Sequence, residues 1–201
     1  SCYCLPGTAM AYVTADEYLS GNVREKLREA RAAAETDPAL ERNVRALEAA
    51  QPVDLEASEI NVRLGATWID KEYIQQFMHE TFSTPPYLRR QIKVEYSPHT
   101  AEWRVSGKTG ISSTNIAANV TYGTSRANAY KILEDSLNLR DVRIFDIVED
   151  PDGTERRVLN QKETTLAQQK QQSIRDAFSE WIWRDPDRRH YLVTLYNEKF
   201  N

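Results

Sequence analysis

The spacing of apolar residues changes repeatedly along the chain between three or four residues and two. Spacings of three and four place apolar side chains on one face of a helix, whereas a spacing of two places them on one face of a strand. Helical spacing dominates both ends of the sequence, and alternation appears several times between them. This pattern predicts an α+β fold: an N-terminal helical hairpin, a small central sheet with antiparallel hairpins, and C-terminal helices packed on it.

The N-terminal hairpin is indicated by two helix starts. Asn22 can accept from free backbone N–H groups, and Glu25 three residues later can reach back to complete the cap. An apolar stripe over 23–34 follows. Asp37-Pro38 then predicts a second helix, because aspartate caps and proline fits the first helical turn. We expect residues 1–52 to form this helical hairpin.

The middle of the chain mixes both spacings. The alternating segment 60–64 predicts a strand, and Thr67 is expected to cap a helix that ends before Pro85-Pro86. Residues 92–105 alternate around a turn at 97–100, which indicates a β-hairpin. The polar segment 106–124 is expected to be a loop, with at most a short strand near 116–122.

The last third is expected to return to helices after one more hairpin. The expected elements are a helix from Ser125, a strand over 142–148, a turn at 150–153, a strand near 156–159, a helix over 165–183 and a last helix starting at Asp185-Pro186. We find no flexible linker, so 1–52 and 53–201 are expected to share one core in a single module, 1–201. Both ends are typical of a segment cut from a longer polypeptide, and Phe200 is accordingly expected to be exposed.

Composition excludes several classes of protein. The chain has 26 Lys and Arg against 30 Asp and Glu, and its pI of about 5.5 is unlike that of an autonomous DNA-binding protein. No apolar run approaches the roughly 20 residues of a membrane helix, and no leader opens the chain. Cys2 and Cys4 are the only cysteines, too few for a disulfide framework. We expect a cytoplasmic protein without membrane contact.

No motif predicts an active site. Thr84-Pro85-Pro86-Tyr87 is similar to the Asp/Asn-Pro-Pro-Tyr motif of adenine methyltransferases, but threonine offers only a hydroxyl where that chemistry needs an amide or carboxylate oxygen. A stop to the preceding helix is the better interpretation. Gly107-Lys108-Thr109 matches the end of a phosphate-binding loop, yet Glu102 stands where the loop needs glycine, and a hairpin exit is favoured. The sequence therefore predicts no enzyme and no cofactor.

The histidines do not predict a metal site either. His79, His99 and His190 are far apart in the sequence and have no partner at metal-ligand spacing.

Two basic clusters could contact phosphates. One surrounds the hairpin at 92–105 and contains Arg89, Arg90, Lys93, Arg104 and Lys108; the other follows the polar loop and contains Arg126, Lys131, Arg140 and Arg143. From these we take Arg104, Lys108, Arg126, Lys131, Arg140 and Arg143 as candidate nucleic-acid-binding residues. On one helix Arg126 and Lys131 lie about 140° apart, so they share a face only loosely. A solvated face with scattered salt bridges is the alternative.

Three stretches are more specific than any of these motifs: DEYLSGNVREKL at 16–27, VRLGATWI at 62–69, and the closing pattern FxxWIxxDxxRRxxLxxxYNxxFN at 178–201. Together they resemble the region between the two enzymatic parts of very large bacterial proteins encoded by phages, plasmids and conjugative elements. In those proteins an adenine-specific DNA methyltransferase is fused to a Swi/Snf-type helicase.

The resemblance implies a non-catalytic module that positions DNA or couples the methyltransferase and helicase parts, its partners being DNA and those flanking domains. A structural scaffold that never touches DNA and an independent enzyme with an unrecognised site stay as alternatives. These patterns leave the preference for DNA sequence or strand form open.

Overall fold

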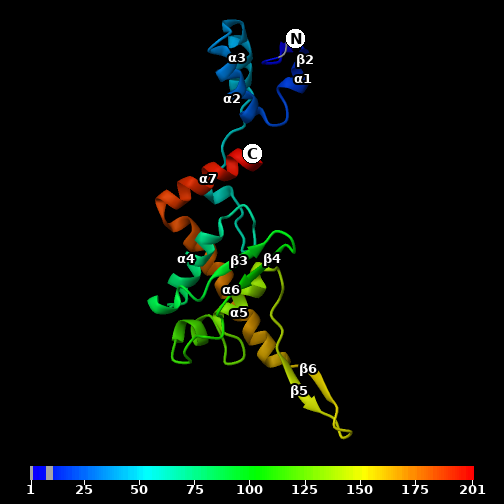
Figure 1. Ribbon diagram of the computed structural model, residues 1–201, viewed down its shortest axis with the longest axis vertical. Coiled ribbons are helices and arrows are strands. Elements are labelled where there is room, and N and C mark those ends of the chain that lie inside the picture. The colour runs from blue at the N-terminus through cyan, green and yellow to red at the C-terminus, as the bar shows by residue number, and fades with distance from the viewer. Residues whose placement is uncertain (1, 8–10) are drawn as a thin grey trace. The chain divides into compact units, whose positions relative to one another are not determined.

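The computed structural model describes residues 2–7 and 11–201, which form two compact units (Figure 1). Unit 1 comprises residues 1–56 and 194–201, and unit 2 comprises residues 57–193. Half of the residues are helical and 12% lie in strands, which confirms the predicted α+β class.

Unit 1 contains the predicted helical hairpin. Its elements are β1 (Cys2–Cys4), β2 (Tyr12–Thr14), α1 (Ala15–Tyr18), α2 (Val23–Ala34), the short turn η1 (Pro38–Leu40) and α3 (Glu41–Ala49). Asn22 caps α2 by accepting from the Glu25 N–H, and its Nδ2 donates to Glu25 Oε2 at 2.9 Å. The start of α2 therefore lies where the capping pattern predicts.

The core of unit 1 is small. Tyr18, Val23, Leu27, Ala30 and Leu47 are buried together. The antiparallel pair of β1 and β2, which sequence reasoning did not anticipate, places Tyr3 beside this core, and its ring stacks on Tyr18 at 5.0 Å.

Unit 2 contains the remaining elements. They are η2 (Ala57–Glu59), α4 (Lys71–Thr81), η3 (Pro86–Leu88), β3 (Val94–Ser97), β4 (Glu102–Val105), the π-helical turn η4 (Ala117–Thr121), α5 (Ala129–Leu137), β5 (Phe145–Glu149), β6 (Glu155–Leu159), α6 (Gln161–Arg184) and α7 (Pro186–Phe200). The residues of α7 from Thr194 onward belong to unit 1. Phe200 at its end is 58% exposed, as expected.

The core of unit 2 forms around α5. Eight of the nine residues of this helix are buried, and β4 and α6 both contact it (Figure 1). Phe77 of α4 meets Phe178 and Trp181 of α6 with ring centroids 5.2 and 5.6 Å apart. The predicted hairpins are present as β3–β4 and β5–β6, both antiparallel.

The division into two units differs from the expected single core. No residue from 51 to 59 is buried, and Val53 is 88% exposed. The chain therefore passes from one core to the other over a segment without a buried residue. The expected central sheet is also absent from the described part of the chain, which instead holds three separate two-stranded sheets.

The predicted strand at 60–64 is wrong, although its alternation is real. Ile60, Val62 and Leu64 are buried, whereas the residues between them are exposed. No described strand pairs with this segment, and its end lies against helix α5. At Gly65, where φ is +90°, a Cβ would lie 2.3 Å from the carbonyl oxygen of Leu137 at the end of α5. Only glycine permits this approach.

Two helices begin about one turn later than predicted. Helix α4 follows Asp70 instead of Thr67. Helix α5 follows Asn128, whose side chain accepts from the Lys131 N–H, instead of beginning at Ser125. The reason for the second delay is a tight turn, in which the Thr124 hydroxyl accepts from the N–H groups of Arg126 and Ala127.

Two further predictions are corrected. Residues 117–121 form the π-helical turn η4 and not a strand, and Asn115 Oδ1 accepts from the Ala118 N–H at its start. Strand β5 begins at Phe145 and not at 142. The backbone N–H groups of Val142 and Ile144 donate to side chains of α6, those of Gln171 and Thr164, and so are not available for strand pairing.

Within the described residues, no helix combines the length and the apolar character needed to cross a membrane.

Candidate nucleic-acid interface

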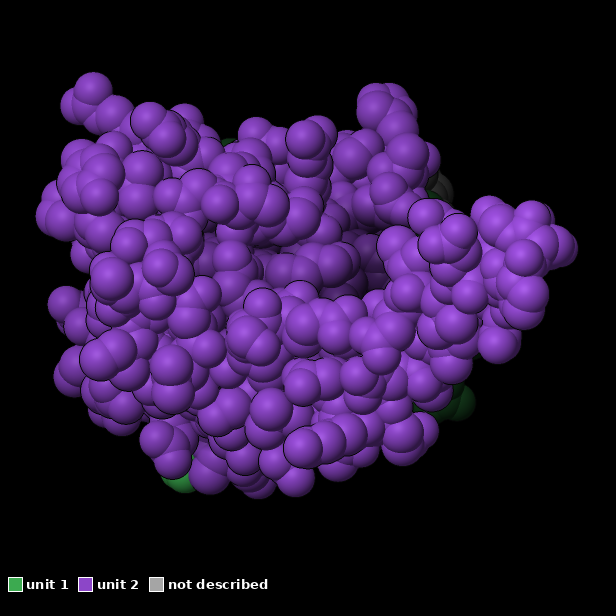
Figure 2. All heavy atoms as spheres, turned by 90° about the horizontal axis from the view of Figure 1, so that it is seen from below, with its two compact units in different colours: residues 1–56, 194–201 green, residues 57–193 purple. Residues whose placement is uncertain are grey.

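Five of the six candidate basic residues line two hollows in unit 2 that share Lys108. The hairpin hollow, of about 520 Å³, is lined by Arg104, Lys108 and Arg140 among others. The cap hollow, of about 360 Å³, is lined by Lys108, Arg126 and Lys131. Arg143 lines neither. Figure 2 shows a face of unit 2 with a deep depression near its centre.

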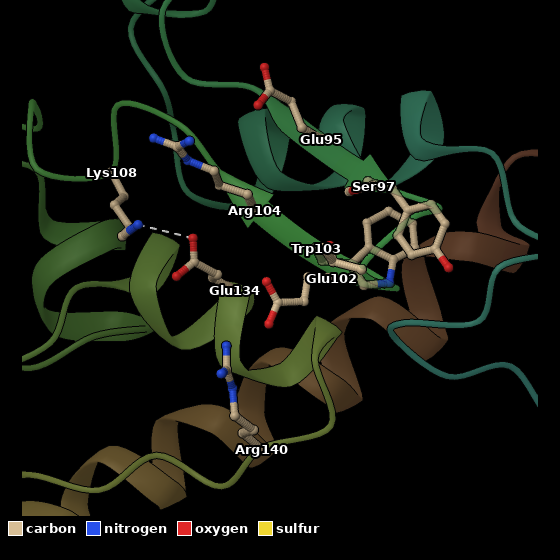
Figure 3. Close-up of a pocket in the computed structure, with 10 residues that line it drawn as sticks. Glu95, Ser97, Glu102, Trp103, Arg104, Lys108, Glu134 and Arg140 are labelled. Atoms are coloured by element: carbon tan, nitrogen blue, oxygen red, sulfur yellow. Dashed lines mark hydrogen bonds and ion pairs between the residues drawn. The ribbon is translucent and has the colours of Figure 1, made fainter.

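The hairpin hollow is balanced in charge. Its lining contains three cations and three carboxylates, and the carboxylates are those of Glu95, Glu102 and Glu134. Figure 3 shows the side chains entering from two directions, Arg104 and Glu95 from the β3–β4 hairpin and Arg140 from beyond the end of α5. Such a mixed lining has no strong preference for an anion.

The cap hollow has no carboxylate in its lining. Besides its three cations it presents the polar side chains of Thr109, Asn119, Thr124, Ser125 and Asn128. Arg126 precedes α5 and Lys131 lies within it, so the expected separation around one helix does not apply. The turn at Thr124 and the cap at Asn128 bring these two residues to the same hollow.

Glu134 lines the hairpin hollow and contacts two lysines that line the cap hollow. Its Oε2 accepts from the buried Val105 N–H at 2.9 Å and from Lys108 Nζ at 3.0 Å, and Lys131 Nζ lies 3.7 Å from Oε1. Burial by itself raises the pKa of this carboxyl, but the Val105 hydrogen bond and the two lysines outweigh burial and hold the pKa below its ordinary value. The ionised Glu134 fixes the position of Lys108 between the hollows (Figure 3).

The other cations are also partly paired. Arg126 bonds Asp146 Oδ1 at 2.8 Å and the Phe145 carbonyl at 2.9 Å, and its hydrogen bond lowers the pKa of Asp146. Lys131 lies 3.0 Å from Asp135, and Arg140 lies 3.9 Å from the same oxygen. Salt bridges thus hold four of the six candidates, whereas Arg104 and Arg143 are exposed without a carboxylate partner in the part of the chain that the structure describes.

Comparison with known proteins identifies a family but no activity. Residues 63–201 match the model of a family described as a domain of unknown function (DUF8437). The chain belongs to this family. No curated protein and no solved structure matches the chain. Both hollows lie inside the DUF8437 domain.

Sequence reasoning missed Glu134 and Tyr87 in the DUF8437 domain. Glu134 stands three residues after Lys131, a spacing that predicts an ion pair on a helix, but its burial depends on the distant Val105. Tyr87 was singled out only as part of a motif, and it proves to be 75% exposed. Its exposure depends on how η3 is held, which no local pattern reveals.

The two motif interpretations agree with the structure. Thr84 is buried, and its hydroxyl lies 2.5 Å from the hydroxyl of Tyr130. Gly107 has a φ of +67°, and a Cβ there would lie 2.8 Å from the Gln91 carbonyl oxygen. This glycine serves the exit of the β3–β4 hairpin, as predicted.

His79 in α4 is buried without a hydrogen bond to its ring among the described residues. It is 6% exposed, and neither ring nitrogen has a hydrogen-bond partner among the residues described. Burial, with a smaller contribution from Arg89, lowers the pKa of His79. Among the residues described, no cluster of three or more potential metal ligands exists.

We expect His79→Leu to flatten the loss of stability on mild acidification. The folded-state pKa of His79 lies below the unfolded value of about 6.5. As the pH falls, the unfolded chain therefore binds a proton at this histidine before the folded chain does. The free energy of unfolding decreases as the pH drops from about 6.5 through the folded pKa. Urea unfolding of both proteins between pH 7 and 5 measures this. Equal slopes with pH for the two proteins would contradict the expectation.

Proposed function

We propose that this domain is a non-catalytic module that positions DNA, with backbone phosphates held at the cap hollow and along the adjoining basic residues. The observation that carries the proposal is the lining of the cap hollow: three cations, several hydroxyl and amide groups, and no carboxylate. Phosphate oxygens accept from such donors, and contacts of this kind orient a protein on DNA without reading its sequence.

The sequence resemblance supports a larger setting for this role. By that resemblance, the domain lies between the methyltransferase and helicase parts of a cytoplasmic bacterial protein of a mobile element, and couples the two. Positioning DNA between two enzymes needs backbone contacts and no catalytic residues, which fits the absence of catalytic motifs in the sequence.

The test is a titration of the protein with labelled DNA at several salt concentrations. Arg126→Glu combined with Lys131→Glu should weaken binding about tenfold or more for every DNA sequence. Two lost phosphate contacts should also reduce the slope of log K against log salt by about 2. The combination Arg28→Glu with Lys162→Glu makes the same change in charge at exposed cations outside both hollows and should leave the slope unchanged.

A structural scaffold is the second candidate, and the β5–β6 hairpin favours it. No third strand joins this hairpin among the residues that the structure describes, and Ile147, Val148 and Leu159 are exposed on it. Isolated two-stranded hairpins are marginally stable in water, so a neighbouring domain that covers these residues would stabilise it. Absence of DNA binding by the wild-type protein at low salt, or unchanged affinity of the doubly reversed variant, would favour the scaffold.

A further inference from the structure

We infer that the nucleic acid bound here is single-stranded, and that one of its bases stacks on Tyr87. This inference rests on the proposed function and adds the form of the strand. It comes from a third hollow of unit 2, the Tyr87 hollow, of about 520 Å³. Its walls include Ser83, Pro85, Tyr87, Ile111, Asn115 and Ile116.

The Tyr87 ring is available for stacking. The side chain is 75% exposed, and no other aromatic ring of the described chain contacts it. Ile116, across the same hollow, is 69% exposed. An exposed aromatic face beside an apolar side chain is the arrangement on which single-strand binding proteins stack bases.

The hollow is held in shape before any ligand arrives. Asn115 Nδ2 donates to the carbonyl oxygens of Phe82 and Ser83 at 3.1 and 3.3 Å, which ties the loop wall to the end of α4. The buried bond between Thr84 and Tyr130 anchors the residues before Pro85. A ligand therefore gains the stacking contact without first ordering the site.

Charge around the hollow favours an anionic occupant. Arg89 and Arg90 follow Tyr87 after Leu88 and lie outside the lining of the hollow. Both are exposed without a carboxylate partner in the described part of the chain, and Arg89 Nε donates to the Thr84 carbonyl at 3.2 Å. The lining contains no carboxylate, and it offers Ser112 and Thr114 for hydrogen bonds. A planar base joined to phosphates matches this combination, because the ring can stack while the guanidinium groups meet the phosphates.

One loop separates the Tyr87 hollow from the cap hollow. Asn119 lines the cap hollow, and its Nδ2 donates at 2.9 Å to the carbonyl oxygens of both Ser112 and Asn115, which line the Tyr87 hollow. A strand crossing this loop would place phosphates at the cap hollow and a base on Tyr87. Bases inside a duplex are covered on both faces by their neighbours, so only an unpaired base can reach the ring.

The experiment compares a labelled oligothymidylate with a duplex of equal length, over the same series of salt concentrations. Tyr87→Ala and Tyr87→Leu should each weaken binding of the single strand about fivefold to a hundredfold, and leave duplex binding and the salt slope unchanged. Tyr87→Trp should retain the affinity, because it keeps an aromatic face. Tyr12→Ala, which removes an exposed tyrosine of unit 1, is the matched control and should change nothing.

The two proposals fail in different ways. If the Tyr87 variants bind the single strand as the wild type does, or if Tyr87→Leu binds as well as Tyr87→Trp, the stacking inference is overturned, and the hollow belongs to another occupant such as a protein segment. The proposed function would survive that result as long as the reversals at Arg126 and Lys131 still weaken binding. A wild-type protein that binds neither form of DNA at low salt would overturn both.

Discussion

Replacing Phe77 by alanine is expected to lower the free energy of unfolding of unit 2 by about 4 kcal/mol. Phe77 is fully buried, and its ring meets the rings of Phe82, Phe178 and Trp181, so the substitution removes contacts between α4 and α6 and leaves a cavity. Part of the cost is the lost transfer of the ring from water, and part is the cavity that a closely packed core does not fill.

Tryptophan fluorescence in urea measures this loss. All four tryptophans lie in unit 2, so their fluorescence follows the unfolding of that unit; they are Trp68, Trp103, Trp181 and Trp183. Tyr87→Ala is the control: it removes an exposed ring from the same unit, and we expect a change within about 0.5 kcal/mol. A comparable loss in both variants would contradict the description of the core.

Glu134→Ala is expected to destabilise unit 2 by about 3 kcal/mol at pH 7. The substitution leaves the buried Val105 N–H without its acceptor, and it removes the carboxylate from Lys108 and Lys131. Glu134→Gln keeps an oxygen that can accept from Val105 and loses only the charge, so its loss should be about half as large. Urea unfolding followed by tryptophan fluorescence ranks the three proteins.

The pH dependence gives an independent check on Glu134. Its folded-state pKa lies below the ordinary carboxyl value of about 4.3, so the ionised group stabilises the fold above that pH. This stabilisation is lost as the pH falls through the folded pKa, and both variants should lack that part of the acid dependence. A Glu134→Ala protein as stable as the wild type at pH 7 would show that the buried carboxylate does not hold β4 to α5.

Where the chemistry of an element lies within a few residues, the sequence alone predicted it. Asn22 with Glu25 sets the start of α2, and Asp37 with Pro38 sets the start of the turn η1 that precedes α3. In both cases the group that accepts from a free N–H donor lies three residues away or fewer. The β3–β4 and β5–β6 hairpins follow for the same reason, since their turns join strands that are adjacent in sequence.

Only the tertiary structure decided features that join residues remote in sequence. The alternation at 60–64 correctly predicted which side chains are buried, but whether a strand forms depends on a partner, and the partner proved to be helix α5. The division into two units depends on which apolar faces pack against each other, and the spacing of apolar residues along the chain does not determine this.

The same holds for the candidate site. Residue type made Lys108, Arg126 and Lys131 candidates, but their meeting at one hollow required the turn at Thr124, the cap at Asn128 and the burial of Glu134. A hollow lined by several cations forms where packing brings side chains from separate elements together. The sequence determined which groups were available for phosphate, and packing determined which of them share a site.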